Sequence, residues 1–323
     1  MHTYGSLYGT ATGINLIYGV FINSLFNTGV SIFMLISGYF GINGTAKKFL
    51  QLELKIIFYS VLSTITICCV QNHWSPTDII KAFFPVISGK YWFITSYMLL
   101  LIFSNYLNKV PNNLERKDFE KLLFLMFSIF SIIPTIVQFH IMNDSGKGFA
   151  NMLLMYYVGR YIRLYWNKPP NILKKIKLML VGIIATEFSL NLALTLIRGG
   201  VGVYAPFARD CASTIIVASI LIFLWFEHLN IRSKLINNIA KHVLAVYLYE
   251  NAIRTCYSNF LDITIYSEEW YLCIVIAIYV IGVIISCIFI DLIRGFVAKP
   301  FENIIYSLWN RFCSYIDNTD KVY

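Results

Sequence analysis

The stretch WYLCIVIAIYVIGVIISCIFI, residues 270–290, decides the fold. It carries no Asp, Glu, Lys or Arg along its whole length. About 20 predominantly apolar residues are enough for an α-helix to cross the hydrocarbon core of a bilayer. We therefore predict a membrane-spanning helix in this stretch.

The composition of the whole chain agrees with a membrane environment. Of its 323 residues, 58% are hydrophobic and only 13% are charged, whereas soluble domains average about 25% charged residues. A soluble core, a nucleic-acid-binding protein and a secreted disulfide scaffold are therefore poor interpretations. The 7 cysteines form no CxxC pair and no metal-ligand spacing, so no metal is expected.

Apolar runs recur from end to end, and nine of them are long enough to be considered spans. We predict an all-α, polytopic transmembrane helix bundle that forms one domain over residues 1–323. The predicted spans are residues 22–42, 56–72, 91–107, 122–142, 149–166, 178–197, 211–226, 239–258 and 270–290.

The distribution of Lys and Arg supports this pattern and orients it. The loops after the first, third, fifth and seventh spans, together with the tail, hold most of the 26 basic residues. Cytoplasmic loops are enriched in Lys and Arg, so these loops and the C-terminus are predicted to be cytoplasmic. Nine spans would then leave Met1 outside without a signal peptide, and we expect the chain to lack a first span.

Ionisable residues inside predicted spans are functional hypotheses, because charge in lipid is costly. Glu187 lies near the middle of the sixth predicted span, with Asn191 one turn further on the same face. Its carboxyl group either holds helices together or lines a substrate path. Glu250 and Arg254 lie four residues apart in the eighth predicted span, and an intrahelical ion pair is the structural alternative to a functional role for them.

Three runs resemble landmarks of membrane acyltransferase family 3, the integral-membrane O-acyltransferases. NTGVSIFMLISGYFGI, Asn27–Ile42, is similar to the signature second helix of the family. FFPVISGKYWFITSYMLLLIFSNYLN, Phe83–Asn108, is similar to its tryptophan-entry helix, and IAKHVLAVYLYENAI, Ile239–Ile253, to a late helix. The resemblance implies ten spans, and His2 matches a histidine that ends the first helix of the family.

The resemblance also implies an activity, namely transfer of an acyl group, usually acetyl, from a cytoplasmic acyl-CoA to a hydroxyl of an envelope polysaccharide. The expected cofactor is acetyl-CoA as the acyl donor. The expected partners are an envelope glycan or lipid-linked sugar as acceptor and membrane lipid, with no nucleic acid, and the expected location is the bacterial inner membrane. The oligomeric state stays open.

Each candidate residue has a role in this chemistry. His2 would act as the general base, while Ser37 and Tyr39 would stabilise the oxyanion. Tight helix packing is an equally good interpretation of Ser37 and Gly38. Glu187 is a further catalytic candidate. The cations that could bind the phosphates of the acyl donor are Lys47, Lys48, Arg160 and Arg163. The residues that could line the acceptor path are Tyr39, Tyr91, Trp92, Tyr97 and Glu250.

Two other interpretations of the sequence remain. A polytopic protein with Glu187 in a polar path could transport a lipid-linked sugar or a small solute, although we find no inverted repeat. Without a first helix, the chain could also be an inactive remnant of an acyltransferase.

Overall fold

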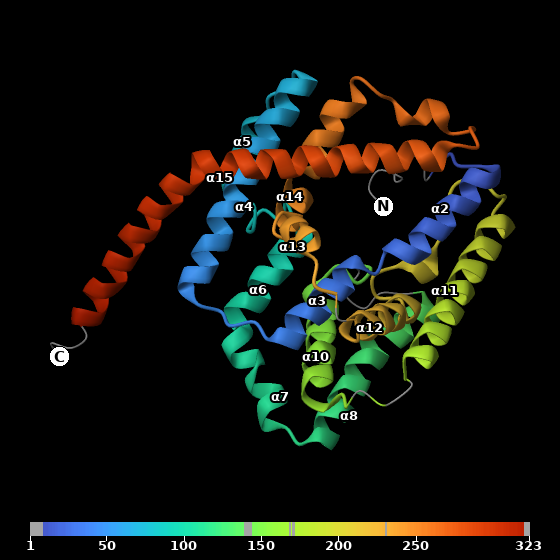
Figure 1. Ribbon diagram of the computed structural model, residues 1–323, viewed down its shortest axis with the longest axis horizontal. Helices are drawn as coiled ribbons and strands as arrows, with labels where there is room; N and C mark the ends of the chain where they lie inside the picture. The colour runs from blue at the N-terminus through green and yellow to red at the C-terminus, as the bar shows by residue number, and fades with distance from the viewer. Residues whose placement is uncertain (1–8, 139–143, 168, 170–171, 230, 320–323) are drawn as a thin grey trace. The chain divides into compact units, whose positions relative to one another are not determined.

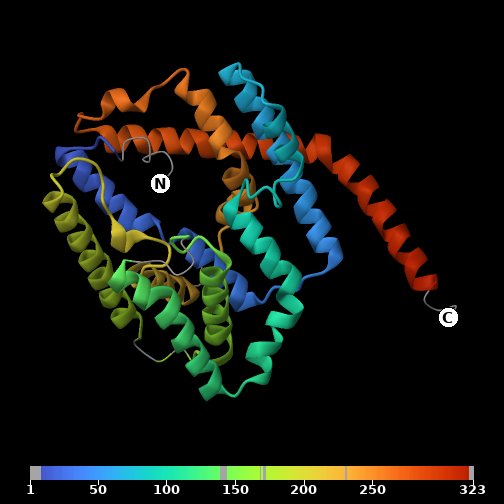
Figure 2. The same cartoon turned by 180° about the vertical axis from the view of Figure 1, so that it is seen from behind.

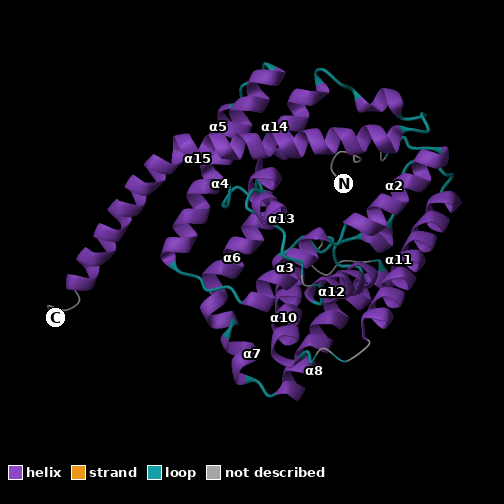
Figure 3. Cartoon of the chain, viewed as in Figure 1, coloured by secondary structure: helices purple, strands orange, loops and turns teal. Residues whose placement is uncertain are grey.

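The computed structural model describes residues 9–138, 144–167, 169, 172–229 and 231–319. Every regular element in these ranges is a helix, joined by loops and turns (Figure 3). The prediction of an all-α fold is confirmed for this part of the chain.

The chain divides into two compact units. The first unit comprises Met1–Gly44, Tyr91–Arg232 and Asp262–Ala277, and the second comprises Thr45–Lys90, Ser233–Leu261 and Ile278–Tyr323. Two compact units do not by themselves define separate domains, so a single domain over residues 1–323 stays a prediction.

The first unit is built mainly on five helices that pack pairwise (Figure 1). α3 packs against α10 and α12, and α11 packs against α2 and α12. The elements of this unit are α2 (Gly13–Phe26), α3 (Gly29–Phe40), α6 (Trp92–Leu107), α7 (Lys109–Asn113), α8 (Arg116–Phe127), the π-helix η1 (Ser128–Ile132), α9 (Ile133–Val137), α10 (Phe149–Tyr165), α11 (Ile172–Ile197), η2 (Pro206–Ala208), α12 (Ser213–Glu227) and η3 (Ile263–Tyr266).

In the second unit, α4 packs against both α5 and α14; Figure 2 gives the view from behind. α15 begins in the first unit and runs through the second, and its C-terminal part contains Pro300. The elements are α4 (Ala46–Gln71), α5 (Pro76–Phe83), α13 (Lys234–Ala240), α14 (Val243–Ser258) and α15 (Leu272–Thr319).

Five helical segments in the described part of the chain are long and apolar enough to cross a membrane. They are Gly13–Phe40, Ala46–Gln71, Arg116–Val137, Ile172–Ile197 and Leu272–Trp309. Each overlaps one of the predicted spans, including the stretch at residues 270–290. The chain is therefore a helical membrane protein with several candidate spans.

The other four predicted spans form α6, α10, α12 and α14, which are helices of 16, 17, 15 and 16 residues. At 1.5 Å per residue, such helices are roughly 23–26 Å long, whereas the hydrocarbon core is about 30 Å thick. The count of nine spans is therefore not confirmed.

The first candidate span also differs from its prediction of residues 22–42. It starts earlier, at Gly13, and is divided into α2 and α3 at Asn27 and Thr28. The predicted span left out the first part of α2, which carries Asn15, but this asparagine is buried in the structure. A polar residue on the protected face of a helix does not stop it from spanning a membrane.

Candidate functional site

Two glycines bring α3 and α10 into close contact. A Cβ atom added to Gly38 would overlap the backbone carbonyl of Tyr156, and one added to Gly159 would overlap the carbonyl of Leu35. Small residues allow helix backbones to approach in this way. Gly38 therefore packs two helices tightly, as the packing interpretation of this residue expects.

The C-terminal halves of α3 and α10 bring three predicted residues together. The guanidinium carbon of Arg163 lies 5.2 Å from the centre of the Tyr39 ring, and its Nη1 donates a 3.4 Å hydrogen bond to the Tyr39 hydroxyl. The same hydroxyl donates to Oε1 of Glu227, on α12, at 3.2 Å. Arg160 lies one turn before Arg163, so both cations sit at the same end of α10.

Arg160 combines partial burial with an unused hydrogen-bond donor. Its Nη2 donates to Oδ1 of Asn112 at 3.3 Å. Its buried Nε has no hydrogen-bond partner among the residues that the structure describes. Gly41, which has a φ of 78°, turns the chain beside this guanidinium, and an added Cβ there would lie 3.2 Å from Nη1. A buried N–H without a partner is costly, and an anionic ligand is one group that would satisfy it.

Tyr39, which contacts Arg163, also lines an apolar groove of about 450 Å³. Tyr39 and Glu227 are its polar residues, and the remainder of the lining comes from α3 and α12: Ile32, Ile36, Phe40, Ile222, Phe223 and Phe226. The groove could accommodate an apolar chain next to the Tyr39–Arg163 pair.

Ser37 and the aromatic candidates lie around α6. Ser37 is half-buried on α3, where its side chain interacts with that of Tyr97. Tyr97 also stacks on Phe93. Tyr91 immediately precedes α6, and Trp92, its first residue, lies 6.0 Å from the ammonium of Lys147.

Three of the remaining predicted residues belong to the second unit, not to the first unit that holds Tyr39, Arg160 and Arg163. Lys47 and Lys48 are exposed in the first turn of α4, and Glu250 is half-buried in α14, all in the second unit. His2 lies outside the described residues.

Glu187 is completely buried in α11, with an exposed fraction of 0%. Neither of its carboxyl oxygens has a hydrogen-bond partner in the described part of the chain. The side chain of Ser24, on α2, is near enough to interact with it, but its hydroxyl makes no hydrogen bond either. Asn191, one turn further, is also buried and uses its Oδ1 to accept from the Phe207 backbone N–H, which leaves its Nδ2 without a described partner.

The sequence did not single out a second buried carboxyl group, that of Asp291 on α15. It accepts hydrogen bonds from the Tyr59 hydroxyl and from Nε of Arg294, the latter at 2.9 Å. Nδ1 of His242 lies 2.6 Å from the other carboxylate oxygen, and Nζ of Lys55 lies 3.8 Å away. Arg294 also pairs with Glu302 at 2.6 Å. Opposite charges balance in this network, which is typical of a site that fixes helices.

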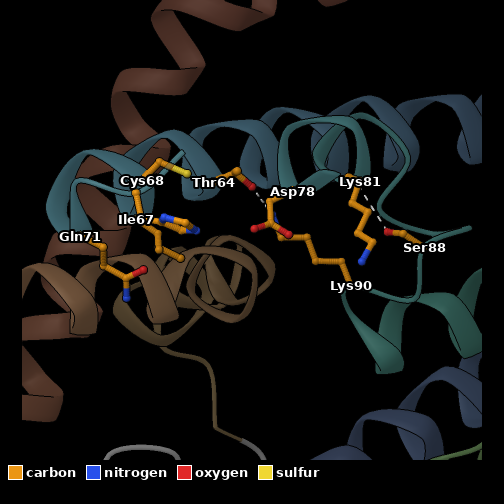
Figure 4. Close-up of a pocket in the computed structure, with 9 residues that line it drawn as sticks. Thr64, Ile67, Cys68, Gln71, Asp78, Lys81, Ser88 and Lys90 are labelled. Carbon is orange, nitrogen blue, oxygen red and sulfur yellow. Dashed lines mark hydrogen bonds between the residues drawn. The ribbon is translucent and has the colours of Figure 1, made fainter. Parts of the chain in front are cut away.

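A pocket of about 370 Å³, with apolar walls and several polar side chains, lies at the C-terminal end of α4, against α5 and the loop that follows α5 (Figure 4). Nζ of Lys90 donates hydrogen bonds to the Ser60 carbonyl at 2.9 Å and to the Thr64 hydroxyl at 2.5 Å. Burial lowers the pKa of this ammonium to about 8, against the opposing effect of the Asp78 carboxylate. The pocket is lined by Thr64, Ile67, Cys68, Gln71, His73, Asp78, Lys81, Ser88 and Lys90.

No group of three or more His, Cys, Asp or Glu side chains in the described ranges could hold a metal ion.

These features define a helical membrane protein with ionisable side chains buried among its helices. A comparison with family models assigns the class: residues 1–291 match the model described as an acyltransferase domain, that of acyltransferase family 3. The chain belongs to this family. No curated protein and no solved structure gives a significant match.

Proposed function

We propose that the protein transfers an acyl group, acetyl in the first instance, from a cytoplasmic acyl-CoA to a hydroxyl of a cell-surface or envelope polysaccharide. Membership of acyltransferase family 3 supports the class of reaction. The donor, the acceptor and the location in a bacterial inner membrane are parts of the proposal.

The observation that carries the donor assignment is the buried Nε–H of Arg160, which has no described partner. Coenzyme A carries phosphate groups, and a guanidinium binds phosphate through charge-assisted hydrogen bonds. Arg163, held against Tyr39, adds a second cation at the same end of α10. The apolar groove beside Tyr39 would take the uncharged arm of the donor.

The chemical step follows from the needs of a sugar hydroxyl, which is a poor nucleophile at neutral pH. The hydroxyl oxygen attacks the thioester carbonyl while its proton passes to a general base, for which we propose the imidazole of His2. The carbonyl oxygen becomes an oxyanion, and Ser37 and Tyr39 are the proposed donors to it. The C–S bond then breaks, the ester is released, and the thiolate of coenzyme A takes up a proton.

The first test measures O-acyl esters on the surface polysaccharide by proton NMR, before and after mild alkali, in cells with and without the gene. An ester signal that disappears with the gene and returns on complementation supports the transferase. An unchanged glycan, with the protein present in the membrane, contradicts it.

A second test addresses the donor site in the purified protein. Arg160→Gln should raise the KM for acetyl-CoA about 10-fold or more, because a hydrogen bond to a charged group is worth roughly 1.5–3 kcal/mol. Arg116→Gln is the matched control, since Arg116 is an exposed arginine on α8 that pairs with Glu120 at 2.9 Å. Equal KM values for the two variants would contradict the assignment.

One observation favours a second function, transport of a lipid-linked sugar or small solute. Glu187, Ser24 and Asn191 place buried polar atoms without described partners inside candidate spans, as a permeation path would require. Proteoliposomes distinguish the two functions. Solute uptake without acyl-CoA, and no release of free coenzyme A when an acceptor is added, would favour transport.

A further inference from the structure

We propose that the pocket at the end of α4 binds a sugar unit of the acceptor that carries both hydroxyl groups and an anionic group, a carboxylate or phosphate. This inference rests on the proposed function and gives its acceptor a binding site and a chemical class.

The size of the pocket suits a small polar ligand. Its volume of about 370 Å³ falls within the roughly 300–1,000 Å³ usual for ligand sites. Its walls come from α4, from α5 and from the segment between α5 and α6, all within the second unit. Figure 4 shows Asp78 and Lys90 side by side along the pocket, with Thr64 and Cys68 on α4 next to them.

The lining offers the hydrogen-bonding groups that sugar hydroxyls need. A sugar hydroxyl both donates and accepts, and so do the hydroxyl groups of Thr64 and Ser88. The amide of Gln71 supplies a donor and an acceptor, and the carboxylate of Asp78 accepts only. A site built from such groups rejects ligands that lack matching hydroxyls, because its polar atoms would then lose their partners.

The balance of charge in the lining points to an anionic ligand. Lys81 and Lys90 face a single carboxylate, that of Asp78. The salt bridges of the described residues do not include Lys81, whereas Lys90 is anchored to α4 through Ser60 and Thr64. Lys81 is therefore the cation best placed to pair with an incoming carboxylate or phosphate.

The walls are fixed by local structure, so the ligand meets a preformed site. Pro76 opens α5 and places Asp78 in its first turn, with Lys81 in its last. The Ser88 hydroxyl donates to the carbonyl of Lys81 at 3.4 Å, and Gly89, with a φ of 66°, turns the chain towards Lys90. The charge pattern of the sequence predicts this loop on the outer face, where an envelope glycan would lie.

The test measures direct binding to the full chain in detergent micelles, by saturation-transfer NMR and calorimetry. The probes are glucuronate and glucose 6-phosphate, with glucose as the matched neutral sugar and inorganic phosphate as the matched free anion. Both acidic sugars should bind more tightly than glucose or phosphate alone. Glucose binding equally well would overturn the anionic requirement, and phosphate binding equally well would overturn the sugar.

Variants locate the site. Lys81→Gln should weaken glucuronate binding about 10-fold, because it removes a charge-assisted contact. Lys117→Gln, at an exposed lysine on α8, is the matched control and should bind as the unmodified chain does. Size-exclusion chromatography checks that both variants are folded, and equal affinity of the two folded variants for glucuronate would overturn the proposal.

The same samples separate this inference from the proposed function. Lys81→Gln should leave the binding of acetyl-CoA unchanged, since the donor residues lie elsewhere. A chain that binds glucuronate through Lys81 but shows no acyl transfer would support the pocket and contradict the enzyme. A chain that transfers acyl groups but does not bind the acidic sugars would contradict the pocket alone.

Discussion

Glu187 and Asp291 are both buried carboxyl groups on long apolar helices, but their surroundings differ completely. Asp291 is 6% exposed and is surrounded by a hydroxyl, an imidazole, a guanidinium and an ammonium. Glu187 is 0% exposed, and neither of its oxygens has a described partner. One carboxyl group is fully satisfied by the protein, and the other is not.

The difference separates a structural acid from a functional candidate. A satisfied network of buried charges makes a core rigid, and breaking it costs several kcal/mol. A buried carboxyl group without partners receives no hydrogen bonds to offset its loss of water, and a ligand or a transferred proton is what would satisfy it. Substitutions at the two positions should therefore affect different measurements.

The largest effect is expected from Asp291→Ala. Without this carboxylate, Arg294 and Lys55 lose a buried counter-ion, which should lower the free energy of unfolding by about 3–5 kcal/mol. The check is thermal unfolding in detergent, followed by fluorescence-detected size-exclusion chromatography. Asp118→Ala is the control, since Asp118 forms an exposed pair with Lys121 at 2.9 Å and its loss should cost at most about 1 kcal/mol. Similar losses of stability in the two variants would contradict a structural role for the Asp291 network.

Glu187→Gln should give the opposite pattern. The amide has nearly the same shape and breaks no hydrogen bond in the described structure, so we expect the free energy of unfolding to stay within about 1 kcal/mol of that of the unmodified chain. If Glu187 transfers protons in the reaction, acyl transfer should fall about 100-fold or more. Full activity in this variant would place Glu187 with the structural residues.

The sequence predicts Glu187 but not Asp291, for a physical reason. Glu187 interrupts an otherwise uncharged run, so the cost of burying charge in lipid identifies it directly. Asp291 follows the uncharged stretch at residues 270–290, where a charge looks like the ordinary end of a span. Its partners Tyr59 and His242 lie 232 and 49 residues away along the chain, and only the folded structure brings them together.

The candidate site for the acyl donor was likewise predicted only in part from the sequence. The sequence indicates Arg160 and Arg163 as cations at the end of a span, and the resemblance indicates Tyr39. The contact between Tyr39 and Arg163, and the partnerless Nε of Arg160, depend on how closely α3 and α10 approach. That distance is set by Gly38 and Gly159, whose effect on packing cannot be calculated from composition.

Asp210 is a third buried carboxyl group, in the loop before α12, and it extends the comparison to a titrating residue. It is 6% exposed, and burial raises its pKa to about 6, with Lys147 opposing and Asp144 adding to the shift. The unfolded chain releases this proton near pH 4, whereas the folded chain keeps it until about pH 6. The folded state therefore binds more protons in this interval, and Asp210 makes stability fall as pH rises from about 4 to 6.

Asp210→Asn tests this expectation because the amide cannot ionise. At pH 7 the variant should be about 1–2 kcal/mol more stable than the unmodified chain, which is part of the roughly 3 kcal/mol that a two-unit shift represents. The difference in unfolding midpoint between the two proteins should shrink as the pH is lowered from 7 to 4. A constant difference across this range would mean that Asp210 does not titrate there.

The smallest effect, expected from Tyr59→Phe, measures how far the partners of Asp291 can replace one another. The Tyr59 ring is fully buried, so phenylalanine keeps its packing and removes only the hydroxyl that donates to Asp291. Arg294 and His242 still donate to the carboxylate, and the expected loss of stability is about 1 kcal/mol.

Tyr249→Phe is the matched control, because that hydroxyl makes a neutral hydrogen bond to Thr66 at 2.7 Å. Hydrogen bonds to a carboxylate are about twice as strong as neutral ones, so Tyr59→Phe should lower the unfolding midpoint more than Tyr249→Phe. The reverse order would mean that Asp291 does not depend on its hydroxyl partner, and that its charged partners alone stabilise it.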